Sequence, residues 1–209
     1  MDIQELFKER GKHAETDMYH HLPYLRQVVI NLKAKQVIEL GVRTGESTVA
    51  FLAGLAETGG KLWSCDIQSP LEVTNHGPGN PIKDHIWGKY DNWEFVKGND
   101  LQVAKQAPKR CDVLFIDTEH TYEQALAELE AYGPRVRPGG VILMHDTYGL
   151  QPKNQVVQAI SKYMDGKDDL TLTNDSECYG LATIRVARKK KTTRAKRSGK
   201  RSHTNKKSA

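Results

Sequence analysis

The sequence predicts an α/β fold, a doubly wound sheet of seven mostly parallel strands that ends in an antiparallel hairpin. Two observations lead to this class. Short apolar runs that suit buried strands alternate with helical patterns along most of the chain, an order typical of parallel strands joined by right-handed crossovers. The last two strand-like runs are separated only by a short linker, Asn174 to Tyr179, and can therefore pair antiparallel.

The expected strands are short and mostly apolar, which suits burial between two layers of helices. In chain order they are Gln36–Leu40, Lys61–Ile67, Trp93–Lys97, Cys111–Asp117, Val141–Met144, Leu170–Thr173 and Gly180–Val186. The expected helices carry apolar residues at helical spacing. In chain order they are Ile3–Lys12, Met18–Leu32, Ser47–Ala56, Leu101–Gln106, Thr121–Tyr132 and Asn154–Met164.

Proline and glycine residues support several of these boundaries. Pro23 favours a helix start, and the pairs Gly59–Gly60 and Gly133–Pro134 follow expected helices. The run Arg137–Gly140 (RPGG) is expected to form a turn before the fifth strand. The segment Gln68–Asp91 is long and irregular, with a short helix expected near Ile82–Lys89. Loops of this length are often functional, and this one is positioned to act as a lid.

The length and the charge distribution predict one domain with a tail. The 209 residues suffice for one domain with a substantial core. Eleven of the 31 basic residues and none of the 26 acidic residues lie in residues 188–209, so the rest of the chain carries a net charge of −6. We therefore predict a domain over residues 1–187 and a disordered basic tail over residues 188–209. Such a tail can contact nucleic acid non-specifically through counterion release.

Composition excludes several other classes of protein. No apolar run approaches the roughly 18 residues needed to cross a bilayer, so no transmembrane segment is expected. The N-terminal residues contain no apolar signal-peptide core, which indicates a cytoplasmic protein. The three cysteines, Cys65, Cys111 and Cys178, do not make a disulfide framework.

In a doubly wound sheet, ligands bind beyond the carboxyl ends of the strands, so functional residues are expected there.

The loop after the first strand reads E39-L-G41-V-R-T-G45-E-S47-T. Gly41 permits a tight turn and Gly45 a close helix start, while Ser47 or Thr48 can cap free backbone amides. Glu39 can accept a hydrogen bond from a ligand amine. The G-x-x-x-G spacing differs from the G-x-G-x-x-G of dinucleotide sites, which disfavours a nicotinamide oxidoreductase. A glycine-bearing loop that joins strand to helix without a ligand is the alternative.

This loop resembles motif I of the class I S-adenosylmethionine-dependent methyltransferases, whose sheet is Rossmann-like. The resemblance implies that the loop backbone lies against the methionine part of S-adenosyl-L-methionine. Asp66 ends the second strand 21 residues after Gly45, where an acid can accept hydrogen bonds from ribose hydroxyls. After the third strand, Asp100 stands where this family contacts adenine, and Asn99 can be a turn residue.

Two later motifs point to the substrate side: I-D117-T-E-H120-T-Y122, and R137-P-G-G followed by H145-D146. Together they resemble a methyltransferase family that includes macrolide-sugar O-methyltransferases and relatives of the cephalosporin-biosynthetic methyltransferase. The resemblance covers roughly residues 37–147. It implies O-methylation of a hydroxyl on a small molecule or sugar, with His120 as the general base and Tyr122 as a supporting residue. Asp117 is expected in both the catalytic and the cofactor-binding sites.

The same strand ends can hold a metal ion. Asp117 and the pair His145–Asp146 end neighbouring strands, which pair about 4.8 Å apart, so their side chains can converge. Two carboxylates and an imidazole can hold Mg²⁺ and suit Mn²⁺ somewhat better. In related metal-dependent members the position of His145 is acidic, so the histidine here leaves metal dependence open. Alternatively, Asp117 and Asp146 orient the substrate or close the pocket floor.

Two other functions compete with this hypothesis. The basic tail favours a nucleic-acid methyltransferase, but the D/N-P-P-Y/F/W motif of amino-group methylation and the Pro-Cys pair of C5 methylation are absent. The other is a non-catalytic module that kept the fold and holds nucleic acid through its tail. The intact cofactor loop and the D-x-x-H residues disfavour it. The sequence does not determine the oligomeric state, and a homo-oligomer is compatible with it.

Overall fold

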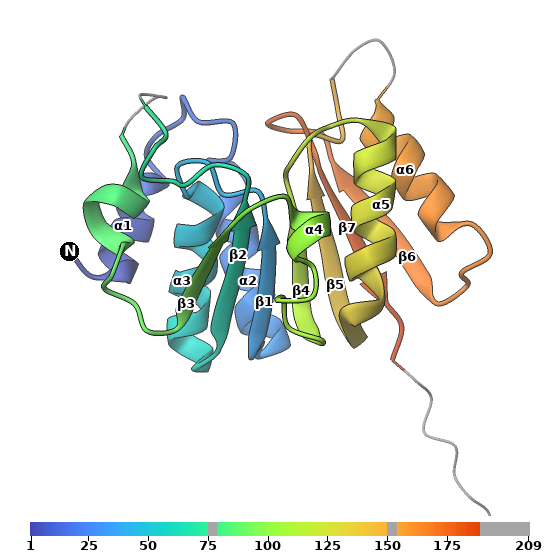
Figure 1. Cartoon of the computed structure of the whole chain (residues 1–209), viewed down its shortest axis with the longest axis horizontal. Coiled ribbons are helices and arrows are strands. Elements are labelled where there is room, and N and C mark those ends of the chain that lie inside the picture. The colour runs from blue at the N-terminus through green and yellow to red at the C-terminus, as the bar shows by residue number, and fades with distance from the viewer. Residues whose placement is uncertain (75–78, 150–153, 189–209) are drawn as a thin grey trace, which may run out of the picture.

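The computed structural model describes residues 1–74, 79–149 and 154–188. Within them, seven strands form one sheet in the order β3-β2-β1-β4-β5-β7-β6 (Figure 1). β1 to β5 run parallel, and β7 pairs antiparallel with both β5 and β6. The predicted fold class, with its C-terminal antiparallel hairpin, is confirmed. The strands are β1 (Gln36–Leu40), β2 (Lys61–Asp66), β3 (Trp93–Lys97), β4 (Cys111–Ile116), β5 (Val136–His145), β6 (Leu170–Asp175) and β7 (Leu181–Val186).

Helices cover both faces of this sheet (Figure 1). They are α1 (Ile3–Arg10), α2 (Leu22–Leu32), α3 (Glu46–Thr58), α4 (Asp100–Val103), α5 (Tyr122–Tyr132) and α6 (Gln155–Met164). α1, α2 and α3 pack together on one face, whereas α4, α5 and α6 lie on the other. Two further short elements are a π-helix at Ile82–Ile86 and a 3-10 helix at Gly133–Arg135.

Two apolar cores lie on the two faces of the sheet and explain why its central strands are apolar throughout. Every residue of β4 is buried. Val113 and Phe115 enter the core beside α2 and α3, while Leu114 and Ile116 enter the core beside α5 and α6. Successive side chains of a strand point to opposite faces, so a strand between two helical layers needs apolar residues at nearly every position.

β5 differs most from its predicted extent. It begins at Val136, so the expectation of a turn at Arg137–Gly140 is wrong. This run continues the strand with a register shift against β4. A Cβ on Gly140 would lie 2.6 Å from the carbonyl oxygen of Asp112. The glycine therefore permits a close approach of two strand backbones at an irregularity, in place of a reversal of the chain.

Other boundaries differ by a few residues. The helix expected near Ile82–Lys89 is the short π-helix that ends at Ile86. α5 begins at Tyr122 after a cap on Thr121, so His120 lies in the loop before the helix. Such shifts are usual at helix ends, where capping side chains decide which residue adopts the first helical turn.

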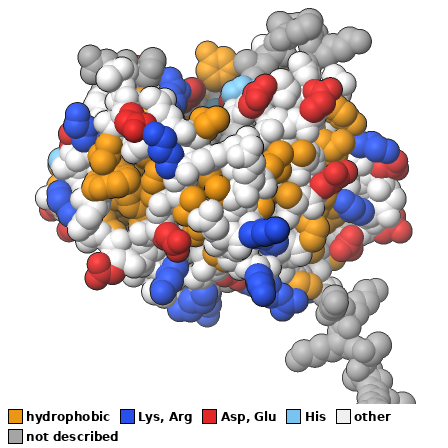
Figure 2. All heavy atoms as spheres, in the orientation of Figure 1, with side chains coloured by type: hydrophobic (Ala, Val, Ile, Leu, Met, Phe, Trp, Pro, Cys, Tyr) orange, Lys and Arg blue, Asp and Glu red, His pale blue; other side chains and the backbone are white. Residues whose placement is uncertain are grey.

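Exposed basic side chains gather along the edge of the sheet where several strands begin (Figure 2). Those next to or at the starts of β1, β2 and β4 are Lys35, Lys61, Lys109 and Arg110. The last described residue, Arg188, lies at this same edge, beside Gly139. Apart from Arg188, the predicted disordered tail lies outside the described residues.

No helix within residues 1–74, 79–149 and 154–188 is long and apolar enough to span a membrane.

Candidate active site

The carboxyl ends of β1, β2, β3 and β4 border a cavity of about 260 Å³ at one edge of the sheet. Its lining residues come from the end of β2, from the segments that follow these strands, the start of α4 included, and from α5. They are Gly41, Cys65, Asp66, Ile67, Gly98, Asn99, Asp100, Asp117, Thr118, Glu119 and Gln124. The structure thus brings together four residues predicted for the cofactor, namely Gly41, Asp66, Asp100 and Asp117. The other three, Glu39, Gly45 and Ser47, are not among the lining residues.

The loop after β1 requires glycine at its first position. Gly41 has φ +85°, and a Cβ there would lie 1.8 Å from the carbonyl oxygen of Asp117. Any side chain would collide with the backbone that follows β4. Gly45, at φ +96°, precedes α3, and a Cβ on it would lie 2.3 Å from the side chain of Ile82. The π-helix therefore packs directly against this loop, which places part of the predicted lid segment over it.

Glu39 faces α3 and not the cavity. Its fully buried carboxylate accepts hydrogen bonds from Ser47 Oγ (2.7 Å), Thr48 Oγ1 (2.9 Å) and Ser64 Oγ (2.5 Å). The expectation that Ser47 or Thr48 caps backbone amides is wrong, because α3 begins after Gly45 without a side-chain cap. Burial raises the pKa of Glu39 to about 7, although the hydroxyl donors oppose the shift. This group ties β1, β2 and α3 together beneath the loop.

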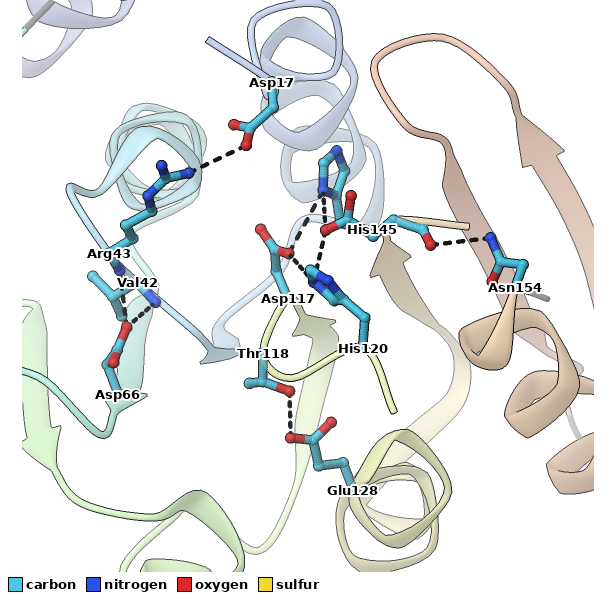
Figure 3. Close-up of polar contacts among 11 residues, drawn as sticks. Asp17, Val42, Arg43, Asp66, Asp117, Thr118, His120, Glu128, His145 and Asn154 are labelled. Carbon is cyan, nitrogen blue, oxygen red and sulfur yellow. Dashed lines mark hydrogen bonds and ion pairs between the residues drawn. The ribbon is translucent and has the colours of Figure 1, made fainter. Parts of the chain in front are cut away.

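Asp66 holds the same loop from β2. Its Oδ2 accepts the backbone N–H groups of Val42 at 2.8 Å and Arg43 at 2.9 Å (Figure 3). A carboxylate has further lone pairs, so Asp66 can still accept hydrogen bonds from ligand hydroxyls in the cavity. Ile67 beside it is 72% exposed and also lines the cavity. Ile67 was not predicted from the sequence as a site residue, because a single apolar residue after a strand has no periodic pattern.

Polar side chains also border the far side of the cavity. Asn99 caps α4, as expected of a turn residue. Asp100 Oδ1 accepts from Gln124 Nε2 at 3.1 Å, and the same Nε2 donates to Glu128 Oε1 at 2.8 Å. Thr118 Oγ1 donates to Glu128 Oε1 at 2.5 Å (Figure 3). Gln124 and Glu128 were not predicted from the sequence as site residues, because a helix with polar residues on several sides does not show which turn faces a ligand.

Four acid and imidazole side chains meet where β4 and β5 end (Figure 3). His120 Nε2 lies 2.7 Å from Asp146 Oδ2 and 3.7 Å from Asp117 Oδ1. His145 Nδ1 lies 3.3 Å from Asp146 Oδ2 and 3.6 Å from Asp117 Oδ1. The side chain of His120 is 40% exposed, more than the other three, so it is the member that an entering molecule can reach.

Asp146 is held in this cluster by its backbone. It has φ +57°, a left-handed conformation that is uncommon outside glycine. Asn154, which caps α6, donates from its side chain to the carbonyl oxygen of Asp146 at 3.2 Å (Figure 3). The carboxylate of Asp146 is therefore directed back toward Asp117 and His120 immediately after β5 ends.

Mutual attraction sets the charges of the cluster. Hydrogen bonds to Asp117 and Asp146 raise the pKa of His120 to about 10. Burial opposes charge on His145, but the same two carboxylates outweigh it and raise its pKa to about 10. Burial likewise opposes charge on Asp117 and Asp146, yet the two imidazoles hold the pKa of both carboxyls below its usual value. These shifts favour protonated histidines and ionised aspartates, so that two imidazolium groups neutralise two carboxylates.

The cluster also has the ligand types of a metal site. Ligand atoms of Asp117, His120 and Asp146 all lie within 4.8 Å of one another. The structure therefore places His120 in this group, where the sequence had suggested His145. His145 contacts the two carboxylates through Nδ1, while its buried Nε2 has no hydrogen-bond partner among the described residues. Two carboxylates and one imidazole fit a divalent transition ion such as Mn²⁺ better than Mg²⁺.

A second cavity, of about 470 Å³, borders the other side of the β1 loop. Its lining residues come from this loop, from the chain before α2 and from the turn before β7. They are Ala14, Glu15, Thr16, Asp17, Tyr19, Arg43, Thr44, Glu46, Cys178 and Tyr179. Arg43 forms an ion pair with Asp17 at 3.2 Å across it (Figure 3). His21, before α2, stacks edge-on against His145 with ring centroids 5.4 Å apart, so this region adjoins the acid–imidazole cluster.

Residues 38–147 match the model of a family described as a methyltransferase domain. A curated relative, the O-methyltransferase ankF of Aspergillus thermomutatus, is 25% identical over 122 residues. The matched part is 56% of this chain and 48% of the relative. The chain thus spans about half the length of that relative.

Solved structures share the fold at low sequence identity. SAH-bound methyltransferase PaMTH1 from Podospora anserina has a TM-score of 0.64 at 14% identity, covering 88% of this chain and 87% of that one. An O-methyltransferase from Bacillus cereus in complex with SAH gives 0.63 at 17%, covering 88% of each chain. The O-methyltransferase TomG from Streptomyces achromogenes, in complex with SAM, gives 0.62 at 17%, covering 81% and 80%. At these identities the likeness shows a common fold.

Proposed function

Because the chain belongs to the methyltransferase-domain family, we propose that it is an S-adenosylmethionine-dependent O-methyltransferase acting on a hydroxyl of a small molecule or sugar. One observation carries this proposal. The 260 Å³ cavity extends from Gly41 and Asp66 to Asp117, which also belongs to the acid–imidazole cluster. A ligand in the cavity therefore ends beside a cluster that combines two carboxylates with two imidazoles.

The lining of the cavity fits S-adenosyl-L-methionine. Gly41 lets the loop backbone approach without a side chain, and Asp66 offers carboxylate lone pairs to ribose hydroxyls. Ile67 offers an exposed apolar surface to a flat base. When bound, S-adenosyl-L-methionine supplies an activated methyl group. Glu39, which is buried against α3 with Ser47, supports the loop from beneath.

We assign removal of the acceptor proton to His120. Its ring is the most exposed member of the cluster, and Asp117 and Asp146 fix its orientation through contacts to Nε2. Because the two carboxylates raise the pKa of His120 to about 10, it can act as a base only after the acceptor or a cation has engaged them. A positioned general base typically contributes about 10²–10⁴-fold to the rate.

A metal-assisted reaction is the alternative use of the same cluster. Asp117, His120 and Asp146 would hold a divalent ion, which would lower the pKa of an acceptor hydroxyl and fix its position. The second cavity is the candidate acceptor site. It shares the loop after β1 with the 260 Å³ cavity, which we call the nucleoside cavity. Its polar lining, including Asp17 and Arg43, suits a molecule rich in hydroxyl groups.

The test uses the full-length protein, radiolabelled S-adenosylmethionine and a panel of phenolic, sugar and aliphatic hydroxyl compounds. Each reaction is run with EDTA and with added Mn²⁺, and heat-denatured protein gives the background. We expect transfer of label to an oxygen of at least one class, with competition by S-adenosylhomocysteine. Activity that persists in EDTA would support His120 without a metal. If calorimetry detects no binding of S-adenosylhomocysteine, the assignment of cofactor and reaction is wrong.

A further inference from the structure

The wall of the nucleoside cavity contains a buried hydrogen-bond group to which the proposed chemistry gives no role. It consists of Asp100, Thr118, Gln124 and Glu128. Glu128 is fully buried and Asp100 is 7% exposed. Each of these carboxyls has one buried oxygen, Glu128 Oε2 and Asp100 Oδ2, without a hydrogen-bond partner among the described residues. Two unpartnered carboxyl oxygens in one buried group require a physical explanation.

A shared proton explains both oxygens. Two carboxylates that lie together in a buried place do not both ionise, because each opposes the charge of the other. Burial and the neighbouring Asp100 carboxyl raise the pKa of Glu128 to about 9, which favours a proton on Glu128 at neutral pH. Glu128 Oε1 already accepts from Thr118 and Gln124, so the proton belongs on Oε2. From there it can be shared with Asp100 Oδ2, the other oxygen without a partner.

This arrangement fixes the side-chain amide of Gln124. Its nitrogen lies 3.1 Å from Asp100 Oδ1 and 2.8 Å from Glu128 Oε1, both of which accept hydrogen bonds. An amide turned the other way would place its carbonyl oxygen against two acceptors. The carbonyl oxygen must therefore point away from the two carboxyls. No described residue donates to it, and Gln124 lines the cavity.

We infer that Gln124 selects the 6-amino group of adenine by accepting a hydrogen bond on its carbonyl oxygen. The inference rests on the proposed function, since it takes the cavity as the nucleoside site. Asp100 and Glu128 act as positioning residues that hold the amide of Gln124 in one orientation. Asp100, the adenine contact expected from the sequence, then acts through Gln124. A 6-oxo purine presents an oxygen where adenine presents N–H, so the site rejects it.

The test compares two nucleosides by calorimetry on the full chain: S-adenosylhomocysteine and its 6-oxo analogue, S-inosylhomocysteine. We expect the wild-type protein to prefer the adenosyl compound by about 10- to 100-fold, the usual effect of replacing a buried hydrogen bond by two facing acceptors. Equal affinity for the two compounds would overturn the inference while leaving the cofactor assignment intact. Absence of binding by both would instead refute the cofactor assignment, and the inference with it.

Variants locate the selectivity. Gln124→Leu should reduce the preference for the adenosyl compound to about threefold or less, mainly by weakening the binding of that compound. Gln124→Met replaces it if the leucine variant does not fold. Gln158→Leu, the same change on an exposed face of α6, should keep it. Glu128→Gln should also keep it, because the new amide donates to Asp100 as the protonated acid does, whereas Glu128→Leu should lose it. A preference that survives in the Gln124 variants would assign selectivity to another group.

Discussion

Replacement of Glu39 by glutamine should make the stability of the protein less sensitive to pH. Glu39 is fully buried and accepts hydrogen bonds from Ser47, Thr48 and Ser64. Burial raises its pKa from the ordinary 4.5 to about 7. Glutamine has nearly the same shape and never ionises. It also suits the three hydroxyl groups, because a hydroxyl can accept as well as donate a hydrogen bond.

The sign and size of the effect follow from proton binding. Between pH 4.5 and pH 7 the folded protein keeps a proton on Glu39 that the unfolded chain releases. The stability contributed by this group therefore falls as the pH rises through that window and is level above it. At about 1.4 kcal/mol per pKa unit, the whole shift is worth roughly 3 kcal/mol. Between pH 5 and pH 8 the wild-type protein should lose about 2–3 kcal/mol that the variant does not lose.

Urea unfolding of both proteins at pH 5, 6, 7 and 8 measures this difference. The free energy of unfolding of E39Q relative to wild type should rise by about 2–3 kcal/mol across the series, because all other groups are shared. Glu94→Gln, at an exposed position of β3, is the control and should stay within about 0.5 kcal/mol at every pH. A difference between wild type and E39Q that does not change with pH would refute the reasoning.

Three further predictions concern the site and the tail. Gly41→Ala should destabilise the fold by about 2–4 kcal/mol in thermal unfolding and weaken the binding of S-adenosylhomocysteine, because its Cβ meets the Asp117 backbone. Gly166→Ala is the control, since Gly166 also has a positive φ but has open space around it, and this change should have a far smaller effect. His120→Ala should slow turnover by about 10²–10⁴-fold with little change in calorimetric cofactor affinity, while His203→Ala in the tail should not; an unchanged rate removes His120 from its role. Truncation after Ala187 should keep the unfolding temperature and abolish salt-sensitive binding to DNA or RNA; a large loss of stability would contradict the domain boundary.

Local pattern and topology were enough to predict most of the fold. β1 and β3 begin and end where the apolar runs Gln36–Leu40 and Trp93–Lys97 do, because polar or glycine residues flank each run. β5 was not predicted in full, since its RPGG run has the composition of a turn. What extends the strand there is contact with β4, where Gly140 allows the backbone of Asp112 to come close. Such a contact between distant residues is not visible in a local pattern.

The same distinction applies to the site. Parallel topology brings strand ends to one edge, so the sequence could predict that Asp66, Asp117 and Asp146 lie there. Side-chain direction was harder to predict. Glu39 faces α3 because successive side chains of β1 point to opposite faces of the sheet. Glu128 lies in the second turn of α5, where its carboxyl accepts a hydrogen bond from Thr118 at the cavity wall. Which groups are charged also depends on partners that only the folded chain brings together.

The left-handed backbone of Asp146 has an energetic cost that its carboxylate offsets. A residue other than glycine pays about 1 kcal/mol for this conformation, and here it also places a carboxylate among buried groups. Glycine would suit the backbone better, but it would remove the carboxylate that pairs with His120 and the buried His145. The ion pairs of its carboxylate therefore offset the backbone strain at this aspartate. Natural homologues in which glycine or asparagine has replaced it are the ones to examine for loss of enzymatic activity.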